Sequence, residues 1–163
     1  MNKNYRYDER SPEEFQRQIK DRTLQERSLF LLWLDMLEKK TSTRPSFSDT
    51  GCGRTGELLE DNEVSMAPDF EVEGYGALEV KFAKPLLERT FHLKANQVKA
   101  YRDQGASILM VNGADTDNPM YAMLDTEALA SIINDCAIVR WHGFGHKPAY
   151  RIPVGKFLWR PLK

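Results

Sequence analysis

Three charged residues stand within a stretch that otherwise has the composition of β-strands. Asp69 precedes the strand-like segment 70–72, and Glu79 and Lys81 follow in "ALEVKFA". Acidic residues and lysine are depleted in strands, so three of them here require a reason. Residues i and i+2 of a strand face the same side, so Glu79 and Lys81 are expected to project together while Val80 faces the core.

A hairpin would bring two of these charges together. Residues 74–76 include two glycines and separate two strand-like segments, 70–72 and 78–80. If these segments pair across the turn, Asp69 comes opposite or near Glu79. Two carboxylates at that distance repel each other, which raises one pKa unless a cation lies between them.

This arrangement favours phosphodiester hydrolysis assisted by a divalent cation. Mg²⁺ binds carboxylate oxygens and backbone carbonyls and usually keeps a substrate phosphate in its shell, and Mn²⁺ is expected to substitute. The backbone carbonyl of Val80 is a candidate further ligand. Lys81 would lie beside the same phosphate, where it stabilises developing negative charge or helps to orient and deprotonate a water. The alternative is an exposed hairpin with a surface Glu–Lys pair.

The length and hydropathy of the chain favour a soluble protein of one domain. The 163 residues suffice for one core, and the longest apolar run, 29–34, is far shorter than a membrane span. The first fifteen residues lack the apolar centre of a signal peptide, so a cytoplasmic location without membrane contact is expected. We expect a disordered N-terminus over 1–10 and a single domain over 11–163.

The order of predicted elements gives an α/β fold with a central mixed sheet flanked by helices. Ser11 and Pro12 are typical of a helix N-terminus, and the helical pattern extends to residue 40 as one helix or two. A Ser-, Thr- and Gly-rich loop is expected over 41–56 and a helix over 91–105, with Asp125 or Thr126 capping another. The segments predicted to be strands, from residue 57 onward, lie around 57–72, 77–83, 106–113, 120–125, 137–141 and 149–154.

The C-terminal part of the chain is basic. No acidic residue follows Asp135. The basic residues after it are Arg140, Lys147, Arg151, Lys156, Arg160 and Lys163. The aromatic residues among them are Trp141, Phe144, Tyr150, Phe157 and Trp159. Such a segment suits a phosphate backbone and unstacked bases, but it equally suits a terminal hairpin whose aromatics pack on the core.

A zinc site is a competing metal hypothesis. Cys136, His142 and His146 have residue types that bind zinc, and Cys52 could be a fourth ligand. The paired Cys-x2-Cys knuckle of common zinc sites is absent, however. Packed or solvated thiols and imidazoles are the alternative, and two distant cysteines form no disulfide framework.

The motif "APDF…LEVK" resembles that of the PD-(D/E)XK nuclease superfamily, with Pro68-Asp69 and Glu79-Val80-Lys81 in the motif positions. The order that follows is more similar to RecU-type Holliday junction resolvases. "FHLKANQVKAYRDQGASILMV" is similar to that family's Phe-x-Leu-Lys stretch, Gln-bearing helix and apolar strand, and "YAMLDTEAL" to its next strand and helix. The resemblance covers residues 57–131.

The resemblance implies a single-domain restriction-endonuclease-like fold and a Mg²⁺-dependent DNA endonuclease. It implies that Asp69 and Glu79 are metal ligands, that Lys81 is the catalytic lysine and that Gln97 lies beside the site. Gln97 to Tyr101 also resembles the Gln-x-x-x-Tyr motif of RecB-type nucleases. The alternative for Gln97 is an amide on the helix surface.

Members of the superfamily often have another acid on the first core helix. Glu26 fits that role, with Glu57 as the second candidate, and either is alternatively an ordinary surface acid. Candidate DNA contacts are Arg44, Arg54, Lys84, Lys94, Tyr101, Arg140, Lys147 and Arg151.

The preferred hypothesis is an endonuclease for branched or junction DNA, which is expected to be a homodimer because a junction has two-fold character. An exonuclease or restriction-type nuclease of the same superfamily is the first alternative. A DNA-binding or assembly module without catalysis is the second, although the complete set of Asp69, Glu79 and Lys81 argues against it. A motif of this kind indicates chemistry better than substrate.

Overall fold

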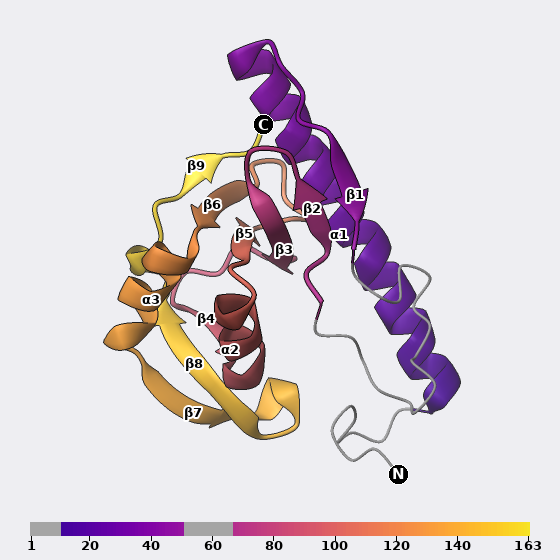
Figure 1. Ribbon diagram of the computed structural model, residues 1–163. Helices are drawn as coiled ribbons and strands as arrows, with labels where there is room; N and C mark the ends of the chain where they lie inside the picture. The colour runs from indigo at the N-terminus through magenta and orange to yellow at the C-terminus, as the bar shows by residue number, and fades with distance from the viewer. Residues whose placement is uncertain (1–10, 51–66) are drawn as a thin grey trace.

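The computed structural model describes residues 11–50 and 67–163, which form a mixed α/β fold with two sheets (Figure 1). The large sheet has the order β1 (Phe47–Asp49), β2 (Phe70–Val72), β3 (Gly76–Ala83), β5 (Ser107–Asn112), β6 (Met120–Leu124) and β9 (Arg160–Pro161). The small sheet has the order β4 (Thr90–Lys94), β8 (Lys147–Pro153) and β7 (Ala137–Trp141). Because β3 and β5 are parallel and the other pairs of the large sheet antiparallel, the predicted mixed α/β sheet is confirmed.

The first helix, α1 (Pro12–Thr41), is a single helix of 30 residues. Its N-cap is Ser11, whose side chain accepts a hydrogen bond from the Glu14 backbone N–H, as the sequence predicts. One stripe of α1 packs on β2 and β3, where the Phe30 ring stacks on Phe70 with centroids 3.8 Å apart. This cluster fixes α1 along one side of the large sheet.

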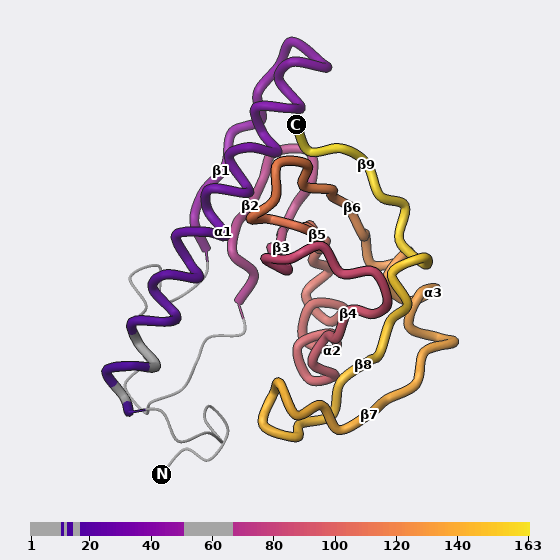
Figure 2. The backbone as a smooth tube through the Cα atoms, turned by 180° about the vertical axis from the view of Figure 1, so that it is seen from behind, coloured from indigo at the N-terminus to yellow at the C-terminus, as the bar shows by residue number. Residues whose placement is uncertain are grey.

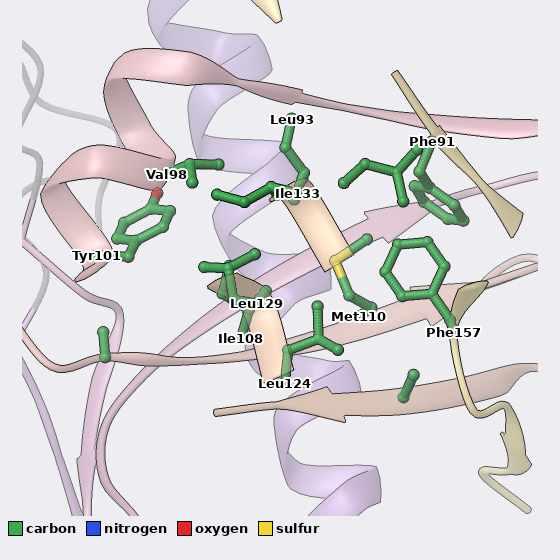
Figure 3. Packing of buried hydrophobic residues seen from close by; sticks show 13 residues of the cluster. Phe91, Leu93, Val98, Tyr101, Ile108, Met110, Leu124, Leu129, Ile133 and Phe157 are labelled. Atoms are coloured by element: carbon green, nitrogen blue, oxygen red, sulfur yellow. The ribbon is translucent and has the colours of Figure 1, made fainter. Parts of the chain in front are cut away.

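The opposite side of the large sheet carries α2 (Ala95–Asp103), α3 (Thr126–Asn134) and the small sheet. Figure 2 shows this separation from behind, with α1 on one side of β3 and β5 and with α2, β7 and β8 on the other. A second cluster fills the space between these elements, and the Tyr101 ring lies at one end of it (Figure 3). Strand β3 therefore has a buried cluster on each face.

Three predictions about the elements are wrong in part. The helix expected over 91–105 begins only at Ala95, since residues 90–94 form β4, in which buried Phe91 and Leu93 alternate with more exposed neighbours. The loop expected over 41–56 contains β1, which pairs with β2. The segments 137–141 and 149–154 do not close the central sheet, because β7 and β8 pair with β4 instead.

No helix in residues 11–50 and 67–163 combines the length and apolar character that a membrane span requires. The sequence-based expectations for residues 1–10, Cys52, Arg54 and Glu57 lie outside the described residues.

Candidate active site

The β2–β3 hairpin brings Asp69 close to Glu79. Phe70 pairs with Leu78 and Val72 with Gly76, so the paired segment is 76–78 rather than the expected 78–80. Continuing this register by one residue places Asp69 opposite Glu79. The Asp69 carboxylate also accepts a hydrogen bond of 2.8 Å from the backbone N–H of Val80, which holds it against β3.

Glu79 and Lys81 form a buried ion pair on β3. The Lys81 ammonium lies 2.8 Å from Oε1 of Glu79, and Glu79 is only 6% exposed. Val80 faces the other way, into the cluster beneath α1, as strand alternation predicts. The alternative of a surface Glu–Lys pair on an exposed hairpin is therefore wrong.

Tyr101 of α2 is the third member of this network. Its hydroxyl donates a 2.8 Å hydrogen bond to Oε1 of Glu79, the oxygen that Lys81 also contacts. The Lys81 ammonium lies 5.5 Å from the centre of the Tyr101 ring. Burial raises the pKa of Tyr101, and the carboxylate of Glu79 acts in the same direction, so the hydroxyl remains a donor. At 3% exposed, Tyr101 packs within the protein rather than on a DNA-facing surface.

Glu26 of α1 is brought to the same place. It is 8% exposed, and its carboxylate accepts a 3.1 Å hydrogen bond from Nε of Arg22. Its charge interacts with those of Lys81 and Glu79, and it raises the pKa of Asp69. Of the two candidates for an upstream acid, Glu26 is thus the one that the described residues place beside the hairpin.

The site holds more negative than positive charge. Burial, with the negative charges of Glu79 and Glu26, raises the pKa of Asp69 to about 8 from its ordinary value of 3.8. Burial also raises the pKa of Glu26, although Lys81 and Arg22 oppose it. Burial lowers the pKa of Lys81, but Glu79, Tyr101 and Glu26 together outweigh burial and raise that pKa. Three carboxylates thus share the positive charges of Lys81 and Arg22.

The donor set fits a hard divalent cation in its chemistry. Carboxylate oxygens are the ligands that Mg²⁺ prefers. The pKa of Asp69 is raised by burial and then by the negative charges of Glu79 and Glu26, which a cation would compensate. Asp69 and Glu79 are the residues that would hold it, with Glu26 and the Val80 carbonyl as further candidates. In the conformation described for 11–50 and 67–163, no three His, Cys, Asp or Glu side chains are arranged to hold one ion.

The other predicted site residues lie at different distances from this network. Gln97 is partly exposed on α2, one turn before Tyr101 and on the same helix face. Lys84 is exposed just after β3, and the Lys94 ammonium lies 5.1 Å from the Phe144 ring. Arg44 lies just beyond the C-terminal end of α1, where its guanidinium bonds to Asp35 and Glu38.

The zinc hypothesis loses support. The Cys136 thiol donates to the backbone carbonyl of Ile132 at the end of α3. The five residues of β7 separate Cys136 from His142, which corresponds to about 16–20 Å at the rise of a strand. These two side chains therefore cannot share a tetrahedral ion in this fold.

Comparison with known proteins finds no matching protein-family model, no matching curated protein and no matching solved structure. A functional assignment therefore rests on the residues and geometry described above.

The raised pKa of Asp69 predicts a pH-dependent stability without divalent cations. Between pH 3.8 and about 8 the folded state keeps a proton that the unfolded state releases, so the contribution of Asp69 is greatest below this range and is lost as the pH rises through it. We expect Asp69→Asn to flatten the fall in the free energy of unfolding between about pH 5 and pH 8, measured by urea unfolding with a chelator. The exposed Asp117→Asn is the control, and equal slopes for both variants would contradict the assignment.

The hydrogen bond from Tyr101 to Glu79 predicts a loss of stability in Tyr101→Phe. The change removes one donor from a buried carboxylate without altering the ring, which costs on the order of 1–3 kcal/mol. Denaturant unfolding measures this loss, and Tyr75→Phe, at a ring that is 41% exposed, should change stability by less than about 0.5 kcal/mol. Equal effects of the two changes would mean that the Tyr101 hydroxyl carries no stabilising contact.

Proposed function

We propose that this protein is a divalent-metal-dependent nuclease that hydrolyses phosphodiester bonds in DNA, with branched or junction DNA as its preferred substrate. The observation that carries the proposal is the convergence of Asp69, Glu79 and Lys81 at one point of the β2–β3 hairpin. The pattern of these residues, and its resemblance to the PD-(D/E)XK superfamily, support the same chemistry.

Each side chain has a distinct role in this proposal. Asp69 and Glu79 would hold the cation, and Glu26 adds negative charge beside them. When bound, the cation polarises the phosphoryl group and offsets its charge. Tyr101 and Lys81 both contact Oε1 of Glu79 and so fix the orientation of that carboxylate.

The charge state of Lys81 favours one of its two possible roles. Because its pKa is raised by the carboxylate of Glu79, Lys81 remains an ammonium at neutral pH. An ammonium cannot accept a proton from an attacking water. In this charge state Lys81 is suited to stabilising the negative charge that develops on the phosphate.

The substrate and the homodimer are proposals that rest on the resemblance to junction resolvases and on the two-fold character of a junction. Incubation with Mg²⁺ and labelled linear, single-stranded, flapped and four-way DNAs tests them. Discrete products from the four-way DNA support a resolvase. Stepwise shortening from DNA ends would instead support an exonuclease, and intact DNA in every arm would favour a module that binds without cutting.

Loss of either central carboxylate is expected to abolish cleavage. In Asp69→Asn and Glu79→Gln the shape of the side chain is kept, but the charge that holds the cation is removed. We expect cleavage to disappear in both variants and in wild type with excess chelator, while DNA affinity stays within about threefold because the basic surfaces are unchanged. Cleavage in excess chelator, or normal turnover by both variants, would refute the metal-dependent mechanism.

Lys81→Ala tests charge stabilisation separately from cation binding. Groups that stabilise transition-state charge typically contribute about 10²- to 10⁴-fold to the rate. We expect kcat to fall by that range while the Mg²⁺ concentration for half-maximal activity changes little. Lys99→Ala, at an exposed lysine paired with Asp103 on α2, is the control and should retain the wild-type rate. An unchanged kcat in Lys81→Ala would mean that the ion pair with Glu79 is only structural.

A further inference from the structure

The small sheet has two faces of opposite character. Residues that pair directly across strands share a face, and the pairs Phe91–Ile152 and Leu93–Tyr150 face the cluster beneath α2 and α3. The other face, here called the outward face, carries His92, Lys94, Trp141, Lys147 and Arg151. No cluster of buried hydrophobic residues lies on this face within the described residues.

Aromatic rings are nevertheless ordered on the outward face. The rings of His92 and Trp141 stack with centroids 3.6 Å apart and planes 5° apart, and His142 adjoins Trp141 at 4.2 Å. His92 and Trp141 come from the two strands that flank β8, so their stack crosses the central strand above Ala149, which is fully buried. A larger residue at that position would separate the rings.

The turn between β7 and β8 is shaped around this stack. A Cβ atom on Gly143 would lie 2.5 Å from Nε1 of Trp141, so only glycine fits there without a shift. Gly145 and His146 both have positive φ angles, which closes the turn tightly. The aromatic residues of the basic tail therefore divide into two groups. Tyr150, Phe157 and Trp159 pack with the core, whereas Trp141 and Phe144 lie outside both clusters.

The charge of this region is uniformly positive. Strands β4, β7 and β8 and the turn contain no Asp or Glu, and all three histidines of the chain lie here. Burial lowers the pKa of His92, and the nearby Arg151 and His142 lower it further, as expected where positive groups gather. Arg151 and His142 are exposed on the surface. An anionic partner is thus favoured.

We propose that the outward face of the small sheet binds the sugar-phosphate backbone of a DNA duplex, as a second contact outside the cleavage site. The inference rests on the proposed function in one respect only, which is that DNA is the molecule bound. The rings stack on one another and so form a rigid support. Because this stacking occupies the ring faces, we expect the basic side chains to make the contacts with DNA. The surface therefore binds phosphates and does not read bases.

Helix α2 connects the small sheet to the candidate site. Helix α2 begins directly after Lys94 and carries Tyr101 seven residues later, which is about 10 Å along the helix axis. Lys94, at the edge of the outward face, therefore directly precedes the helix whose Tyr101 hydroxyl bonds to Glu79.

The test compares basic residues on the two faces of one hairpin. Lys147→Gln with Arg151→Gln removes charge from the outward face, whereas Arg140→Gln removes it from the opposite face, where Arg140 is paired with Pro148. The Arg140 guanidinium also donates a 3.2 Å hydrogen bond to the His146 carbonyl of the turn, so thermal melting must first show that Arg140→Gln keeps the wild-type fold. Binding of a labelled duplex is followed by fluorescence anisotropy over a range of salt, with chelator present to prevent cutting.

The double variant should lower the slope of log K against log salt by about 1.8, or 0.9 per contact. Arg151→Gln alone, at an exposed position, should lower it by about 0.9.

The outcomes separate this proposal from the nuclease proposal. An unchanged slope in the double variant, or an equal loss in Arg140→Gln, would overturn binding by the outward face even if wild type cleaves DNA. A reduced slope in the double variant, together with no cleavage by wild type in a parallel incubation with Mg²⁺, would support the outward face and refute the nuclease. Equally tight, equally salt-dependent binding of poly-glutamate would indicate an acidic protein partner and would overturn the assignment to DNA.

Discussion

The ion pair between Lys81 and Glu79 is the interaction on which the rest of the site depends. Strand β3 is buried on both faces, and charges there are costly unless they are paired and hydrogen-bonded. Lys81 neutralises Glu79, and Tyr101 adds a hydrogen bond to the same oxygen. Removing one partner would leave a buried charge uncompensated, so the positions of β3 and α2 are linked through this one carboxylate.

The same burial creates an imbalance that the protein alone does not neutralise. Asp69 and Glu26 lie near Glu79, and the pKa values of both are raised. A protein fold selected only for stability gains nothing from three carboxylates that share two cations. The imbalance is accounted for if the site exists to receive a divalent cation, and perturbed pKa values of this kind are typical of functional sites.

The sequence predicted what depends on local signals and missed what depends on distant pairing. Ser11 and Pro12 marked the start of α1, and the glycines at 74–76 marked the hairpin. The two-residue shift in register was not predictable, because the turn allowed more than one pairing. Strand β4 was missed because α2 follows it without a turn residue and without a side-chain cap at Lys94. Its partner, β8, lies more than fifty residues away along the chain.

The candidate site, like the fold, was predicted only where local sequence signals define it. Strand alternation predicts that Glu79 and Lys81 share a face, and the spacing of Gln97 and Tyr101 predicts one face of a helix. Neither pattern tells which helix packs on which strand, so the hydrogen bond from Tyr101 to Glu79 and the approach of Glu26 required the tertiary structure. The sequence also did not tell which aromatic residues of the basic tail pack in the core and which lie on the outward face, because this depends on where β4 lies.

Calorimetric titration with Mg²⁺ in buffers of different ionisation enthalpy tests the central claim most directly, because it measures cation binding and proton release together. With a pKa of about 8, Asp69 is mostly protonated at pH 7 and must lose that proton to become a ligand. We predict saturable binding with release of about one proton per ion at pH 7, a much smaller release above about pH 9, and loss of the release in Asp69→Asn. Absence of saturable binding, or binding without proton release at pH 7, would contradict a cation site built on these carboxylates.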